Sequence, residues 1–274
     1  MDQEKIELTF ETPAVPAAAL ETAAPQQAVD QALAAAEQMA QRLSPEEQKM
    51  VDDFADKIDV TNTSMVMQYG AASQKKIADF SESALENVRT KDMGEVGDMI
   101  TGLMTELKGF SVDEEEKGGF FGFFKKTGNK IATMKAKYDK VEVNVDKISE
   151  ALEGHQIQLM KDVALLDKMY DLNLMYFKEL TMYILAGKKK LKQVRENDLP
   201  ILLDKAKMSG LPEDAQAAND LSAQCNSFEK KLHDLELTRM ISIQMAPQIR
   251  LVQNNDKMMT EKIQSTLVNT IPLW

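Results

Sequence analysis

The chain has 274 residues, 43% of them hydrophobic, and glycine (12) and proline (8) are scarce enough that the composition favours helices over sheets. Its formal net charge of -11 disfavours nonspecific binding of nucleic acid, because such binding depends on the neutralisation of phosphates by cations. Its one cysteine, Cys225, cannot close an internal disulfide. The sequence has neither a signal-peptide start nor an apolar stretch of about 18 residues. We therefore expect a cytoplasmic protein that does not span a membrane.

The first 110 residues predict a tail followed by a small helical domain. Residues 1–29 combine three prolines with Ala, Gln, Glu and Thr, which predicts a disordered tail. Residues 30–110 predict the N-terminal helical domain, because apolar residues recur there at helical spacing. Its clearest helix start is Ser44-Pro45-Glu46-Glu47, where a capping serine precedes a proline at the first helical position and an acid at the third.

Residues 111–127 predict a linker that carries an unusual aromatic and basic segment. This Phe-Lys segment comprises Phe120, Phe121, Phe123, Phe124, Lys125 and Lys126, and Lys130 lies just beyond it. The rings could insert at a bilayer interface while the amines meet anionic headgroups. They could also seal the entrance of a helical core. The sequence leaves both destinations open.

Residues 128–274 predict a long antiparallel helical hairpin that resembles a coiled-coil bundle. Apolar residues keep the spacing of a heptad seam from Tyr138 to Tyr183, and His155, Asp162 and Asn173 interrupt that seam. Polar residues in a seam commonly fix the register of the paired helices. The fold class expected for the whole chain is therefore all-α.

Prolines mark the irregular points of the two hairpin helices. Pro200 predicts a break or kink near the end of the first helix. Gly210 followed by Pro212 predicts a stop and a new start, and Pro247 predicts a kink inside the second helix.

The sequence offers no recognisable catalytic, cofactor-binding or metal centre. His155, His233 and Cys225 lie on separate heptads and lack the spacing of metal ligands. The glycine motifs that cradle nucleotide phosphates and the strained turn that presents a nucleophilic serine are missing too. We therefore expect a nonenzymatic protein without cofactor or metal, which meets protein partners through helical surfaces and does not bind nucleic acid. Peripheral contact with an anionic membrane and homo-oligomerisation stay open.

Several sequence stretches point to one known family. Gly119 to Phe124 leads into Lys137-Tyr138-Asp139-Lys140, and the last 30 residues are the most specific part. Within them the distinctive residues are Pro247, Gln248, Ile249, Arg250, Gln253, Asn254, Asn255, Pro272 and Trp274. These stretches resemble the bacterial TelA family of toxic anion (tellurite) resistance proteins. The resemblance also implies a further helical segment after the tryptophan, so the chain looks truncated at its C-terminus.

The resemblance implies a part in resistance to toxic anions, but it assigns no chemical reaction. The expected function is that of a nonenzymatic helical protein that contributes to resistance to tellurite or other toxic anions, as a scaffold or a membrane-peripheral stress factor. One alternative is a protein that binds a metal or oxyanion or reduces it, and another is a purely structural coiled-coil adaptor. Reduction needs a thiol pair or a redox cofactor, and Cys225 alone supplies neither.

Overall fold

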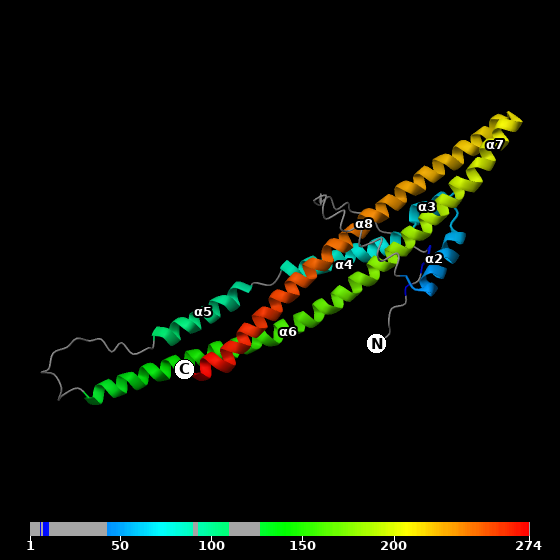
Figure 1. Ribbon diagram of the computed structural model, residues 1–274. Coiled ribbons are helices and arrows are strands. Elements are labelled where there is room, and N and C mark those ends of the chain that lie inside the picture. Colours follow the sequence, from blue (N-terminus) through cyan, green and yellow to red (C-terminus); the bar gives the residue numbers. More distant parts are fainter. Residues whose placement is uncertain (1–5, 7, 11–42, 90–92, 110–126, 274) are drawn as a thin grey trace. The chain divides into compact units, whose positions relative to one another are not determined.

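The computed structural model describes residues 6, 8–10, 43–89, 93–109 and 127–273. Every regular element in these ranges is a helix, which confirms the all-α prediction (Figure 1). The elements are α2 (Pro45–Lys57), α3 (Thr63–Gln68), α4 (Ala71–Arg89), α5 (Met93–Gly109), α6 (Thr127–Gln193), η1 (Val194–Asp198), α7 (Leu199–Ser209), α8 (Pro212–Ser265), η2 (Thr266–Thr270) and α9 (Ile271–Leu273).

The start of α2 has the predicted capping box. The Glu47 N–H donates to Ser44 Oγ at 3.2 Å, and the Ser44 N–H donates to the Glu47 carboxylate at 2.8 Å. Two backbone donors that the helix itself cannot satisfy are thus paired. Val51 and Phe54 then form the buried stripe of this helix.

Two long helices, α6 and α8, make up most of the described chain. α6 has 67 residues and α8 has 54, so at about 1.5 Å per residue they measure about 100 Å and about 80 Å. Their connection turns at Gly210, whose φ of 62° is the left-handed conformation that glycine tolerates. Pro212 begins α8, as predicted, and α8 continues through Pro247 without ending there.

Two five-residue π-helical turns, η1 and η2, each end two residues before a proline. In both turns the N–H of the next residue donates to the carbonyl five residues earlier. Pro200 and Pro272 follow, and a proline lacks an N–H and crowds the carbonyl four residues before it. The wider turn accommodates the ring and lets the helical path continue. At Pro200 the structure therefore has a π-turn where the sequence predicted a break or kink.

Residues 1–86 and 169–249 form one compact unit, called unit 1. In its described part, α2, α3 and α4 pack with the end of α6 and the start of α8 around an apolar core. The rings of Phe54, Tyr69, Tyr183 and Phe228 lie at the centre, and their neighbouring centroids are 5.0 to 6.1 Å apart. The Tyr69 hydroxyl also donates to the Tyr183 carbonyl at 2.7 Å, which ties α6 to the short helices.

Two glycines allow close packing in unit 1. Gly70 has a φ of 67°, and a Cβ on it would lie 2.8 Å from Leu235 Cδ1. A Cβ on Gly187 would lie 2.4 Å from Leu232 Cδ2, so α6 and α8 pack too closely here for any side chain. The close approach of α6 and α8 at this point therefore depends on Gly187 having no Cβ.

Part of the N-terminal tail contacts unit 1. Phe10 stacks on Phe54 with a centroid distance of 4.5 Å. The Thr9 N–H donates to the Tyr183 hydroxyl at 2.8 Å, and that hydroxyl donates to the Thr9 carbonyl at 3.0 Å. The sequence predicts a disordered tail over residues 1–29, because three prolines lie there among Ala, Gln, Glu and Thr. Of this tail the structure describes only residues 6 and 8–10, and its other residues lie outside the described ranges, so the tail stays a prediction.

Residues 87–168 and 250–274 form a second compact unit, unit 2. Its described core joins α5 to the long helices and contains Val96, Leu103, Leu107, Val145, Leu152, Leu159 and Ile263. The short helices of the predicted N-terminal domain thus divide between the two units, since each buries its apolar stripe against α6 and α8. The predicted boundaries at residues 29, 110 and 127 stay predictions.

Among the described helices, none combines the length and the apolar character that crossing a bilayer requires.

Candidate functional site

The predicted polar seam residue Asn173 lies at a contact between α6 and α8 in unit 1. Its amide donates to the Ser242 carbonyl at 2.8 Å, and Ser242 Oγ donates to Asn173 Oδ1 at 2.7 Å. Asn173 is 2% exposed and Ser242 is fully buried. Any shift of one helix along the other would leave these groups buried without partners, so the pair fixes one register.

A second polar contact between the same two helices lies in unit 2, and it contains two of the predicted family residues. The Arg250 guanidinium donates to Asp167 at 2.7 Å and to the Gln253 side-chain oxygen at 2.6 Å. The Gln253 amide donates to the Val163 carbonyl at 3.2 Å. A hydrogen bond from Gln253 and then the Arg250 guanidinium hold the pKa of Asp167 below its usual range. These groups bind each other and thereby hold α8 against α6.

The other predicted family residues lie apart from this cluster. Ile249 is 1% exposed and packs as a core residue. Pro247, Gln248, Asn254, Asn255 and Pro272 are exposed. Trp274 and Phe120 to Lys126 lie outside the described residues, and of Lys130 the structure describes only the helical backbone.

The interrupting seam residues His155 and Asp162 also lie in unit 2. Asp162 is buried and accepts a hydrogen bond from Gln158 at 3.1 Å, whereas His155 is half-buried. In the ranges that the structure describes, no group of three His, Cys, Asp or Glu side chains could hold a metal ion.

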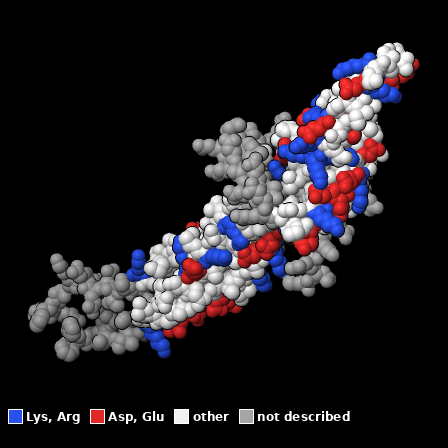
Figure 2. Space-filling model, turned by 45° about the vertical axis from the view of Figure 1, so that its right-hand side comes forward, with Lys and Arg blue, Asp and Glu red and all other residues white. Residues whose placement is uncertain are grey.

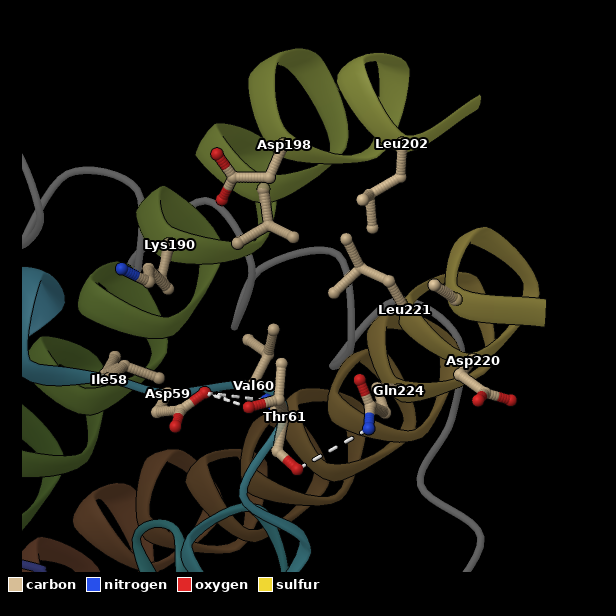
Figure 3. A pocket seen from close by; sticks show the side chains of 12 residues that line it. Ile58, Asp59, Val60, Thr61, Lys190, Asp198, Leu202, Asp220, Leu221 and Gln224 are labelled. Carbon is tan, nitrogen blue, oxygen red and sulfur yellow. Dashed lines mark hydrogen bonds between the residues drawn. The ribbon is translucent and has the colours of Figure 1, made fainter. Parts of the chain in front are cut away.

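Unit 1 also has a surface groove that the sequence did not predict (Figure 3). Its volume is about 530 Å³, and the connection between α2 and α3, the end of α6, η1, α7 and α8 all contribute to it. Figure 3 shows Leu202 and Leu221 facing each other across this groove. Its residues are Ile58, Asp59, Val60, Thr61, Lys190, Val194, Asp198, Leu202, Ala217, Asp220, Leu221 and Gln224. No sequence pattern predicts the groove, because these residues come from five separate segments of the chain.

The groove combines apolar side chains with mostly acidic edges. Asp59, Asp198 and Asp220 contribute three carboxylates, and Lys190 contributes one ammonium group. The Thr61 hydroxyl and N–H donate to Asp59 at 2.6 and 2.9 Å. These bonds, helped by Lys190, lower the pKa of Asp59, so it stays ionised at neutral pH. The groove therefore favours a cationic group over an anion.

The chemistry of Cys225 bears on the reductive alternative. The thiol is 1% exposed and belongs to the core of unit 1. Burial raises the pKa of Cys225, and the Asp198 and Glu229 carboxylates raise it further, although Arg195 opposes them. A high pKa disfavours the thiolate, which is the reactive form.

The profile of the family described as "Toxic anion resistance protein (TelA)" matches residues 51–274. The chain belongs to the TelA family. The predicted resemblance is thereby confirmed, and the match includes Arg250, Gln253 and every residue that lines the groove.

Proteins of several bacteria are similar to most of this chain. A TelA-like protein of Staphylococcus saprophyticus is 36% identical over 236 residues, which is 85% of this chain and 63% of that protein. A TelA-like protein of Staphylococcus epidermidis is 36% identical, with 87% and 64% covered. An uncharacterised protein of Listeria monocytogenes is 37% identical, with 88% and 61% covered. The chain thus spans less than two thirds of the length of these relatives, and no solved structure matches it.

Proposed function

We propose that this chain contributes to resistance to toxic anions as a nonenzymatic helical scaffold in the cytoplasm, which meets protein partners through its helical surfaces. Membership of the TelA family suggests the resistance role. The scaffold role rests on one observation, which is that buried or bridging polar groups pair α6 with α8 in both units.

These polar contacts suit a scaffold because they fix position more than they add stability. A buried polar pair at a helix interface contributes little net free energy but strongly disfavours other registers. In unit 1 this buried pair is Asn173 and Ser242. In unit 2 the side chains of Asp167 and Arg250 are largely exposed and bridge the two helices at their surface. A fixed register keeps the exposed side chains of both helices in a constant arrangement, which a binding partner needs.

The Arg250 and Gln253 contacts favour a structural role over a chemical one for this part of the family signature. Arginine often binds oxyanions, but here its guanidinium is paired with Asp167 and Gln253. The high pKa of the buried Cys225 also argues against thiol-based reduction. The membrane-peripheral alternative depends on the Phe-Lys segment and stays a prediction.

The proposal is tested by measuring tellurite resistance in a bacterial host whose own gene of this family has been deleted. The chain with Cys225→Ala should protect as well as the native chain, because the thiol is a packed core group. The double variant Asn173→Leu/Arg250→Leu, which removes a polar contact in each unit, should protect less. Loss of protection by a folded Cys225→Ala chain, or tellurite reduction by the purified native chain, would instead support the reducing alternative.

A further inference from the structure

The groove of unit 1 lies beside a helix that lacks packing partners on most of its surface. α7 has no buried residue, and none of residues 199–217 is buried in the described structure. Ile201, Met208 and Leu211 are 67, 88 and 54% exposed. Figure 2 shows residues other than Lys, Arg, Asp and Glu at the tip of this end, with basic and acidic residues beside them. Large apolar side chains exposed together on a short segment mark a contact surface.

The charges that line the groove are mainly negative. The two lysines of α7 are already paired, Lys205 with Asp214 at 2.8 Å and Lys207 with Asp204 at 3.4 Å. At the groove, Asp198 from η1 and Asp220 from α8 lie at opposite edges (Figure 3). An apolar surface between acidic edges complements an apolar surface between basic ones.

We infer that the groove of unit 1 and the adjoining face of α7 bind an amphipathic helix of a partner protein that carries apolar side chains flanked by lysine or arginine. This inference rests on the proposed scaffold function and identifies the kind of partner. The apolar side chains of such a helix would lie between Leu202 and Leu221, and its basic flanks would meet Asp198 and Asp220. Helix-in-groove binding of this type uses apolar residues three and four positions apart.

The charge pattern argues against two other occupants. An oxyanion would meet three carboxylates and one ammonium group in the groove. A second copy of this chain, whose formal net charge is -11, would bring excess acid to an acidic surface.

The test uses the full chain and two synthetic helical peptides with the same leucine face, one flanked by lysines and the other by glutamates. Fluorescence anisotropy should show that the lysine peptide binds about tenfold more tightly, because opposite charges at the rim favour it and like charges oppose its counterpart. Added salt should weaken the binding of the lysine peptide, because these rim charges are exposed.

Variants identify the site of binding. Asp198→Asn/Asp220→Asn should weaken the lysine peptide about fivefold, and Leu202→Ser should weaken both peptides. The control Asp53→Asn/Asp56→Asn changes the net charge equally on exposed residues of α2 outside the groove, and it should leave affinity unchanged. Circular dichroism checks that each variant is folded.

Three results would overturn the inference: no binding of the lysine peptide, equal binding of both peptides, or equal effects of the groove and control variants. Self-association of the chain that Asp198→Asn/Asp220→Asn or Leu202→Ser abolishes would also overturn it, because the occupant would then be a second copy. The proposed function fails separately, if resistance depends on Cys225 or if the chain reduces tellurite.

Discussion

At the scale of single residues, the buried polar side chains are of two kinds. Some specify how the helices pair, and others only reduce stability. Asn173 and Ser242 satisfy each other across two helices. Arg239 is 8% exposed, and its Nε has no hydrogen-bond partner among the described residues. Burial lowers the pKa of Arg239, although Glu236 opposes this effect. The two sites therefore predict opposite responses to apolar substitution.

Asn173→Leu should lower the free energy of unfolding by about 1 to 3 kcal/mol, because Ser242 Oγ would lose its acceptor at 2.7 Å and keep only the longer contact with the Asn173 carbonyl at 3.3 Å in a buried site. The double variant Asn173→Leu/Ser242→Ala should recover much of that loss, since no buried polar side chain is then stranded. Urea denaturation of the native chain, both single variants and the double variant gives the coupling energy. Additive losses would mean that the two side chains do not act as a pair.

Arg239→Met should leave the free energy of unfolding unchanged or raise it by about 1 kcal/mol or more, because an apolar side chain of similar length replaces a poorly satisfied buried charge. Thermal denaturation measures the change. A loss of several kcal/mol would reveal that the guanidinium has a strong partner in the folded chain.

At the scale of elements, the pairing of α6 with α8 depends on how closely their backbones approach. Two glycines of α6 differ in this respect. Gly187 lies against Leu232, whereas a Cβ on Gly154 would meet nothing within 4 Å. Substitution of each glycine by alanine therefore separates the effect of helix packing on stability from the effect of helix propensity.

Gly187→Ala should destabilise unit 1 by about 1 to 3 kcal/mol, because the added methyl group overlaps Leu232 and forces the helices apart. Gly154→Ala is the matched control and should stabilise the chain by about 0.5 to 1 kcal/mol through better helix propensity. Both changes are measured by chemical denaturation. If the two substitutions had the same sign, close packing at Gly187 would not matter to stability.

The contact of Arg250 with Asp167 predicts how stability depends on pH. The folded state lowers the pKa of Asp167, so the ionised carboxylate favours folding. This contribution is complete above the unfolded pKa of about 3.9 and is lost as the pH falls through the lower folded pKa. Asp167→Asn should therefore reduce stability at pH 7 and flatten the stability profile below about pH 4. Parallel pH profiles for the native and variant chains would argue against this linkage.

At the scale of the whole molecule, the TelA family match and the structure support different parts of the functional argument. The family supplies the association with toxic anions. The structure supplies two units in which the same helix pair is held by polar contacts, together with a groove whose charge disfavours anions. The resistance assay with Cys225→Ala belongs to this scale, because it asks whether the molecule acts by chemistry or by binding. We expect binding.

The sequence by itself determined the helical fold, the capping box at Ser44, the restart at Pro212 and the polar seam position Asn173, because each depends on local spacing or on one residue's backbone chemistry. The tertiary structure alone decided which helices share a core, since an amphipathic stripe specifies that it must be buried but not against which partner. It also decided that Phe10 packs on Phe54, that Arg250 pairs with Asp167, and that residues from five elements form one groove. Such contacts join residues far apart in the chain, and no local pattern encodes them.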